Sequence, residues 1–303
     1  MSAATANISK VRRPPAWQAD LALVIVALLW GTTFVIVKRA LNDISTLHFL
    51  AIRFAVASVC MLAMFARTFQ SAGAGPVLAG MRGGAIAGIF LWLGYVLQTL
   101  GLKYTTAGKS GFLTGLYIVL VPVIGTVVYR RKPQKRELIG VCIATAGMAV
   151  LTLPSFDRQL RMNRGDALTL GCAVAFAFQI LLLGYYSQRE RYEAVALGQI
   201  AATALLSTVF LGFESSAIVW TRELIFAIAL TGVFATAVAF ALQTWAQQYT
   251  TANRTALIFA LEPVFAFATA VAVGGEPVTV WAVCGGALIL GGILAVELKP
   301  RAA

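Results

Sequence analysis

Long apolar runs separated by short polar segments extend along nearly the whole chain. A helix that crosses the hydrocarbon core of a bilayer needs about 20 mostly apolar residues. By this criterion the pattern predicts ten spanning helices, at residues 20–40, 46–67, 83–103, 107–129, 137–153, 166–187, 194–213, 223–247, 253–273 and 278–297. We therefore expect an all-α integral membrane protein with ten transmembrane helices.

One polar pattern occurs twice and divides the chain into two related halves. Leu97-Gln98-Thr99 followed by Tyr104-Thr105-Thr106-Ala107 returns as Leu242-Gln243-Thr244 followed by Tyr249-Thr250-Thr251-Ala252, an offset of 145 residues (242 − 97). The same offset aligns Gly140 with Gly285 and Gly147 with Gly292. Each half holds five predicted spans, an odd number, so the second half must lie inverted relative to the first. Inverted repeats are the architecture of alternating-access transporters, which bind their substrate between the halves.

The pattern also predicts how the chain is divided and oriented. We expect a cytoplasmic N-terminal tail at 1–19, a first five-helix repeat at 20–153, an extracytoplasmic linker at 154–165, a second repeat at 166–298 and a cytoplasmic C-terminal tail at 299–303. With both termini in the cytoplasm, the inside segments carry more Lys and Arg than the outside segments, largely through the cluster from Arg130 to Arg136. This bias follows the positive-inside rule. The expected location is the cell (inner) membrane.

Composition agrees with a lipid environment and limits the partners. Apolar residues make up 59% of the chain and charged residues 12%, about half the charged share of a soluble domain. The net charge is +12, but the charges stand at the ends of apolar runs, which favours anionic lipid headgroups over nucleic acid. The four cysteines lie inside apolar segments without paired spacing, so neither disulfides nor a metal site is predicted. No cofactor is expected.

Only two ionisable residues lie well inside the predicted spans, Arg53 and Glu262. A charge at the centre of a bilayer costs about 2.5–3.5 kcal/mol on insertion scales, which makes such residues functional candidates. Glu262 precedes Pro263, which removes a backbone donor and disturbs the preceding turn. Glu262 is expected to bind a cationic group of the substrate or to exchange a proton, or else to form a structural ion pair with Arg53. Arg53 lies near enough to its helix end to reach the interface instead.

Two prolines in the fourth and ninth spans, Pro122 and Pro263, suggest interrupted helices at the site. At the strict offset of 145 they do not align. With a local slip of four residues they do, and Val121 then stands opposite Glu262. On this alignment the acid belongs to one half only, and the site is asymmetric.

Lys109 and Arg254 correspond at the offset of 145, each near the start of its helix and on opposite faces of the membrane. Positive charge at a helix N-terminus is unfavourable, so these residues are candidates for gates with an acidic partner or for lipid anchors. Asp20 and Asp166 open the first helix of each half, where a role as N-cap is sufficient to explain them.

Polar and aromatic side chains complete the candidate substrate site. They are Trp30, Thr33, Tyr95, Gln98, Thr114, Tyr117, Gln179, Gln243 and Trp245, together with Glu262. Gln98 and Gln243 are repeat mates and can approach the midplane symmetrically. Glutamine and threonine also bridge membrane helices in purely structural roles.

Several motifs carry a resemblance to a known family. They are Leu29-Trp30-Gly31-Thr32-Thr33-Phe34, Arg53-Phe54, Tyr104-Thr105-Thr106-Ala107-Gly108-Lys109-Ser110, Leu261-Glu262-Pro263-Val264 and Gly275-Glu276-Pro277. The chain resembles the EamA-type branch of the drug/metabolite transporter superfamily over residues 20–298. This resemblance implies a ten-helix carrier of small polar or amphipathic metabolites, often outward. Where the second half has Gly275-Glu276-Pro277, the first has Arg131-Lys132-Pro133, which favours headgroup contact for that loop.

The sequence thus predicts a secondary transporter that exports small metabolites such as amino acids or their derivatives. An importer or exchanger of a vitamin- or nucleotide-type metabolite and a multidrug efflux carrier are the alternatives. No nucleotide-binding motif is present, which argues against ATP-driven transport. A single histidine, His48, lies close to the interface, and no HExxH or P-loop occurs, so an enzyme is not expected. Proton coupling and the choice between monomer and homodimer stay open.

Overall fold

The computed structural model describes residues 15–130, 133–152, 162–214, 218–274 and 278–297, and its elements are helices. The first half contains α1 (Ala16–Gly31), α2 (Phe34–Ala40), α3 (Thr46–Ala72), α4 (Ala74–Leu102), α5 (Ala107–Gly115), α6 (Tyr117–Tyr129) and α7 (Lys135–Thr152). The second half contains α8 (Arg164–Ser187), α9 (Tyr192–Val209), the 3-10 helix η2 (Phe210–Phe213), α10 (Arg222–Gly232), the π-helix η3 (Val233–Val238), α11 (Ala239–Gln247), α12 (Ala252–Phe259), α13 (Glu262–Gly274) and α14 (Val280–Glu297).

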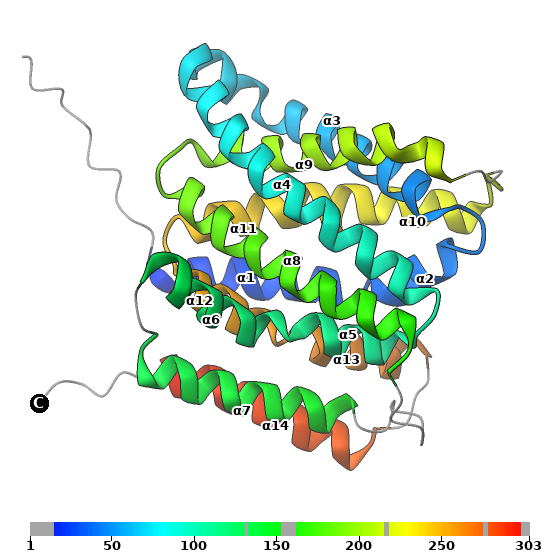
Figure 1. Ribbon diagram of the computed structural model, residues 1–303, viewed down its shortest axis with the longest axis vertical. Coiled ribbons are helices and arrows are strands. Elements are labelled where there is room, and N and C mark those ends of the chain that lie inside the picture. The colour runs from blue at the N-terminus through cyan, green and yellow to red at the C-terminus, as the bar shows by residue number, and fades with distance from the viewer. Residues whose placement is uncertain (1–14, 131–132, 153–161, 215–217, 275–277, 298–303) are drawn as a thin grey trace, which may run out of the picture.

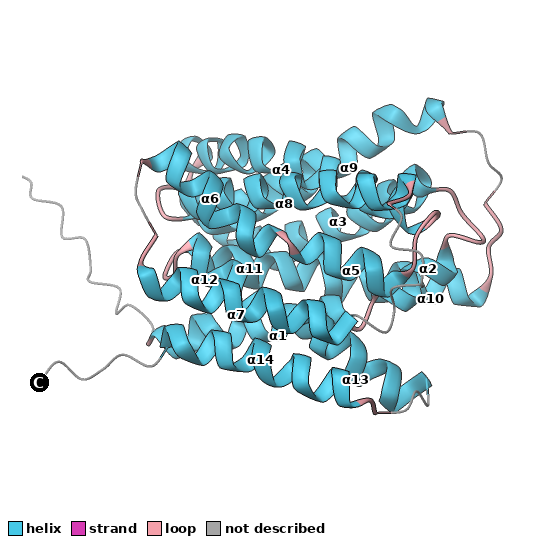
Figure 2. Ribbon diagram, turned by 60° about the horizontal axis from the view of Figure 1, so that its bottom comes forward, coloured by secondary structure: helices cyan, strands magenta, loops and turns pink. Residues whose placement is uncertain are grey.

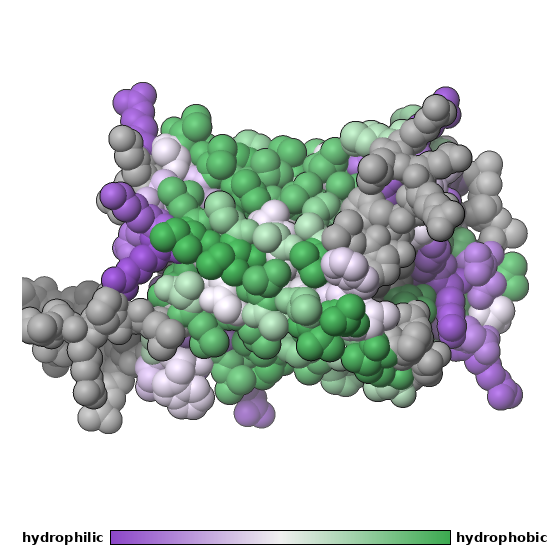
Figure 3. Space-filling model, turned by 90° about the horizontal axis from the view of Figure 1, so that it is seen from below, coloured by the Kyte–Doolittle hydropathy of each residue, from purple (hydrophilic) through white to green (hydrophobic). Residues whose placement is uncertain are grey.

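Each predicted span falls on one of these helices or on a consecutive group of them. Within the described residues, seven helical stretches are long and apolar enough to cross a membrane. The predicted spans 137–153, 253–273 and 278–297 coincide with α7, the pair α12 and α13, and α14. Figure 3 shows an apolar belt between two polar ends. The prediction of an all-α membrane protein is confirmed.

The two halves run in opposite directions. In Figure 1, α1 and α2 pass from left to right, whereas α8, the first helix of the second half, passes from right to left. We call the left end, where α1 begins and α14 ends, the basic end, because Arg130, Arg136, Arg189 and Arg254 lie there; the right end is the opposite end. Figure 2 shows from a second angle that the helices lie side by side along the same direction of the bundle. Most of the predicted tails and linker lie outside the described residues, as do Arg131, Lys132 and the motif Gly275-Glu276-Pro277.

Glycines bring α7 and α14 into backbone contact across the two halves. A Cβ atom on Gly147 would lie 2.7 Å from the carbonyl oxygen of Gly285, and one on Gly285 would lie 2.6 Å from that of Gly147. Gly140 and Gly292 make the same reciprocal contact, at 2.7 Å in each direction. Gly147 therefore packs on Gly285, the repeat mate of Gly140, and Gly140 packs on Gly292, the repeat mate of Gly147. Such exchange of partners is what a pseudo-twofold axis between the halves requires.

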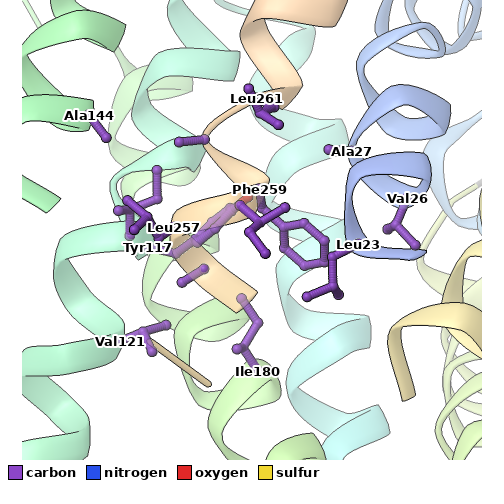
Figure 4. Packing of buried hydrophobic residues seen from close by; sticks show 14 of the residues in the cluster. Leu23, Val26, Ala27, Tyr117, Val121, Ala144, Ile180, Leu257, Phe259 and Leu261 are labelled. Carbon is purple, nitrogen blue, oxygen red and sulfur yellow. The ribbon is translucent and has the colours of Figure 1, made fainter. Parts of the chain in front are cut away.

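An apolar cluster fills the space between the halves toward the basic end. Figure 4 shows side chains from several helices of both halves meeting there. Leu23 of α1, Val121 of α6, Ile180 of α8 and Leu257 of α12 are each at most 3% exposed. The cluster closes the interior of the bundle on this side.

Gly84 on α4 supplies a test of this packing. A Cβ atom there would overlap the carbonyl oxygen of Val195 on α9, and overpacking of this kind costs about 1–3 kcal/mol. We expect Gly84→Ala to lower the midpoint of thermal unfolding in detergent. Gly75→Ala in the same helix, where nothing lies within 4 Å of the new atom, should leave it unchanged. Equal midpoints for the two variants would contradict the packing described here.

Candidate functional site

Two spans of the bundle are interrupted at equivalent positions. α5 and α6 meet at Leu116, and α12 and α13 meet at Ala260 and Leu261. Leu116 and Leu261 are 145 residues apart (261 − 116), so the interruption itself is repeated. The strict offset therefore pairs Tyr117 with Glu262, and the expectation that Val121 stands opposite Glu262 is wrong.

The prolines contribute differently to the two interruptions. Pro263 lacks the N–H that would otherwise bond to the carbonyl of Phe259, so it explains why α12 ends there. Pro122 lies inside α6, beyond the break at Leu116. The break in the first half thus precedes its proline, which is why aligning the prolines gave the wrong register.

A single cavity between the halves brings together most of the predicted site residues. Its lining includes Trp30, Thr33, Arg53, Tyr95, Gln98, Thr114, Tyr117, Gln179, Gln243 and Glu262. The space that the centre of a water molecule can reach inside it is ≈ 60 Å³, enough for a few waters, since one needs about 10–15 Å³. Trp245 does not line this cavity; its ring packs against Tyr249 at 5.5 Å.

Arg53 points into the cavity and is 3% exposed. Its Nε donates to Thr236 Oγ1 at 2.7 Å, and its Nη2 donates to the Tyr95 hydroxyl at 3.4 Å and to the carbonyl of Ala235 at 3.5 Å. Thr236 and Ala235 belong to η3, whose π-helical turn frees backbone carbonyls that an α-helix would use. The guanidinium therefore donates its hydrogen bonds to neutral acceptors. Neither the structural ion pair with Glu262 nor an extension to the interface is formed.

Glu262 is the first residue of α13 and faces the same cavity. The Tyr117 hydroxyl donates to its Oε2 at 3.5 Å. A carboxylate at a helix N-terminus is favoured by the helix dipole. Because Tyr117 and Glu262 are repeat mates and touch each other, the pseudo-twofold axis passes between them. The cavity thus lies on the axis.

The walls of the cavity consist of repeat mates with unlike chemistry. At the offset of 145, Tyr95 corresponds to Phe240, Thr114 to Phe259 and Tyr117 to Glu262. Gln98 and Gln243 are the pair of identical mates. The indole of Trp30 donates to the carbonyl of Ala235 at 2.9 Å and packs on Phe240 and Phe259 at 5.2 and 5.0 Å. A symmetric backbone therefore encloses an asymmetric binding surface.

Two ion pairs among the described residues join the halves, one at each end of the bundle. At the basic end, Arg254 makes a bidentate contact with Asp20, at 2.9 and 2.7 Å. At the opposite end, Lys109 pairs with Asp166, whose other oxygen accepts from the Thr105 hydroxyl at 2.8 Å. Lys109 and Arg254 are repeat mates, so the two pairs are equivalent. They supply the acidic partners that the gate hypothesis requires.

The interpretation of Asp20 and Asp166 as N-caps is wrong. Asn163 is the N-cap of α8, and Asp166 is the third helical residue, which completes a capping box with it. Asp20 lies a full turn inside α1, which begins at Ala16. Both acids instead reach across to a basic residue of the other half. Sequence alone could have found them, because Asp20 and Asp166 are spaced by nearly the repeat offset (166 − 20 = 146).

A second hollow lies at the basic end, on the same helices as the cavity. The volume that the centres of water molecules can reach inside it is ≈ 520 Å³. Its lining includes Pro122, Thr126 and Tyr129 of α6, Tyr185 and Gln188 at the end of α8 and Asn253 of α12. Val121 of α6 and Leu257 of α12 are both buried (Figure 4). Along these two helices they lie between the residues that line the cavity and those that line the hollow. No group of three or more His, Cys, Asp or Glu within the described ranges is placed to hold a metal.

Comparison with known proteins identifies this arrangement. The model of the EamA-like transporter family matches the chain twice, over residues 17–153 and 163–298. The chain belongs to the EamA-like transporter family. It is 37% identical over 283 residues to an uncharacterized transporter of Archaeoglobus fulgidus, covering 93% of this chain and 86% of that protein. It is 24% identical to the uncharacterized transporter YvbV of Bacillus subtilis, over 96% of this chain and 95% of that one.

A known crystal structure shares the fold. It superposes with a TM-score of 0.78 at 19% identity, covering 95% of this chain and 100% of the other. The EamA-like family is a family of transporters rather than of enzymes, so the expected function class agrees with it. The family and the spanning helices together indicate a multi-pass membrane protein.

Thr236 tests whether Arg53 is held as described. Thr236→Val removes the nearest acceptor of a buried guanidinium, and a hydrogen bond to a charged group contributes about 1.5–3 kcal/mol. We expect a lower midpoint of thermal unfolding in detergent. Thr231→Val is the matched control, because the Thr231 hydroxyl is equally buried and bonds only the Ala227 carbonyl of its own helix at 2.7 Å. Equal effects of the two substitutions would mean that Thr236 does not stabilise Arg53.

Proposed function

We propose that this EamA-like protein is a secondary transporter that exports small zwitterionic metabolites such as amino acids by alternating access. The observation that carries the proposal is the presence of Arg53 and Glu262 in one buried cavity without an ion pair between them. A cation and an acid held apart in this way fit a cargo with both charges. The cargo carboxylate would bind Arg53, and its ammonium group would bind Glu262.

The energetics favour a charged cargo over a neutral one. Burying an isolated charge costs several kcal/mol even after relaxation, and a well-placed partner offsets that cost. Arg53 has neutral acceptors only, and Glu262 has one phenolic donor at 3.5 Å. A zwitterion supplies the missing counter-charge to both residues at once, through charge-assisted hydrogen bonds.

The absence of a cationic partner beside Glu262 also supports proton coupling. A buried carboxyl group without a cation beside it is favoured in its neutral, protonated form. The ammonium group of a cargo would replace that proton, and release of the cargo would allow a proton to return. Glu262 would then carry either a proton or the cargo. Inward movement of protons would thereby drive outward movement of cargo.

The two cross-half ion pairs are proposed as the gates. In this structure both pairs are closed, Arg254 with Asp20 at the basic end and Lys109 with Asp166 at the opposite end. Opening the cavity to one side requires the halves to part at that end, which separates one pair and leaves the other as a hinge. Export would begin at the basic end, which the charge bias predicts to be cytoplasmic and which already carries a hollow.

A multidrug carrier is the second candidate. Trp30, Phe176, Phe240 and Phe259 give the cavity aromatic walls, which suit flat amphipathic cations. Arg53 argues against it, because an unpaired guanidinium repels a cargo that is only cationic. The binding site is complete within one chain, so we propose a functional monomer.

Counterflow in proteoliposomes tests the function. Labelled amino acids and lipophilic cations would be screened with the wild type and with Glu262→Gln, which keeps the shape of the side chain but removes its charge. We expect the wild type to exchange amino acids, and the variant to lose at least about tenfold in rate because the ammonium group loses its ion pair, a difference of ~1.4 kcal/mol. Wild type that exchanges lipophilic cations but no amino acid would overturn the zwitterion assignment.

The gates are tested by reversing one pair. Arg254→Asp places two carboxylates together, and because the native pair is bidentate and about three-quarters buried, we expect about a tenfold loss of counterflow. The double variant Arg254→Asp with Asp20→Arg should recover most of it. Arg67→Asp, an exposed charge at the same end, serves as the control and should have little effect. Failure of the double variant to recover any transport would exclude the pair as a gate.

A further inference from the structure

Gln243 of α11 is fully buried, with 0% of its surface exposed, and lines the central cavity. Within the described part of the chain, neither its Oε1 nor its Nε2 has a hydrogen-bond partner. Burying an amide without a hydrogen-bond partner is unfavourable, because the group loses its hydrogen bonds to water and gains none in return. An amide kept at such a position therefore points to a partner that arrives in the cavity.

The internal repeat explains why Gln243 lacks a partner. Its mate Gln98 donates through Nε2 to the Thr114 hydroxyl at 3.2 Å. The residue that corresponds to Thr114 in the second half is Phe259 (259 − 114 = 145), which has no hydroxyl. The chain thus supplies an internal partner for one glutamine of the pair and withholds it from the other. The difference lies at the cavity, where the two walls face each other.

The other buried amides nearby each have at least one hydrogen-bond partner. Gln247 donates through Nε2 to the carbonyl of Ile180 at 3.0 Å, although its Oε1 has no partner. Gln179 donates to Gln199 Oε1 at 3.0 Å, and Gln199 donates in turn to the Thr244 hydroxyl at 3.2 Å. These contacts hold α8, α9 and α11 together. Gln243 is different from them because neither of its amide atoms has a partner.

We propose that Gln243 selects cargo by pairing with a neutral group that offers a donor and an acceptor side by side, as a carboxamide does. The proposal rests on the proposed transport of zwitterions and adds a third contact to Arg53 and Glu262. Amide groups bind one another through two parallel hydrogen bonds, in the same manner in which glutamine reads the edge of adenine. The favoured cargo is an amino acid with a carboxamide side chain.

Selectivity follows from which buried atoms the cargo can satisfy. Gln243 has no surface that water reaches, so both of its amide atoms lack a partner while the site is unloaded. A carboxamide that enters and meets this side chain gives both atoms a partner, whereas an apolar side chain of the same size leaves them unpaired. Sites built to hydrogen-bond a substrate group reject analogues that lack it by large factors. Gln243 would therefore affect cargo choice more than overall affinity.

Glutamine and methionine form the test pair, because both are zwitterions of similar length and differ in the side-chain carboxamide. Counterflow of each would be measured with wild type and with Gln243→Leu. We expect the wild type to prefer glutamine and the variant to lower the glutamine-to-methionine ratio at least about tenfold, mainly by slowing glutamine. Gln247→Leu, one turn farther along α11, is the matched control, because Gln247 is equally buried, donates to the carbonyl of Ile180 at 3.0 Å and does not line the cavity; its ratio should stay within about threefold of wild type.

The outcomes separate this proposal from the proposed function. Gln243→Leu that leaves the ratio unchanged, or slows both cargoes equally, overturns the role of Gln243 while amino acid transport stands. Wild type that exchanges neither cargo overturns both. Thermal unfolding provides a second readout, because leucine replaces an unpartnered amide and should not lower the midpoint. If Gln243→Leu does not fold, Gln243→Met, which has a similar length and carries neither amide atom, should show the same loss of preference.

Discussion

A charge buried inside a membrane-spanning bundle needs a compensating partner, and this constraint determines how the cavity is built. Arg53 is compensated by neutral acceptors that the π-helical turn of η3 presents, namely the hydroxyl of Thr236 and the carbonyl of Ala235. Glu262 rests against one tyrosine hydroxyl at the axis of the repeat. The two opposite charges are thus close enough to share a cavity and are kept from neutralising each other. Most of the chemistry assigned to this protein follows from that separation.

The repeat gives the protein symmetric mechanics and an asymmetric site. Glycine contacts between α7 and α14, the two cross-half ion pairs and the equivalent helix breaks obey the pseudo-twofold axis. We propose that these features govern how the halves move against each other. At the cavity the mates diverge, Tyr117 to Glu262 and Thr114 to Phe259. A carrier must move symmetrically between two faces yet bind a cargo that has no symmetry of its own, and the distribution of changes between the repeats is consistent with both demands.

Sequence periodicity predicted the helices and their inversion because apolar length and odd span number suffice for both. Arg53 and Glu262 were also identifiable, since charge inside a span is rare. The register at the site was not, because the prolines suggested a slip of four residues that the repeated break at Leu116 and Leu261 excludes. The hydrogen-bond partners of the buried polar side chains were harder still to predict from sequence. Whether Arg53 meets Glu262 or Thr236 depends on how η3 packs against α3, and the unsatisfied state of Gln243 depends on Phe259, a residue with no polar signal of its own.

The proposed cargo site lies on the axis between the halves and contacts both of them. A structure determined with a bound zwitterionic amino acid tests this arrangement. We expect the cargo carboxylate within hydrogen-bond distance of Arg53, from the first half, and its ammonium group within that distance of Glu262, from the second. Cargo held only in the hollow between Tyr129 and Tyr185, or touching a single half, would exclude a site on the axis.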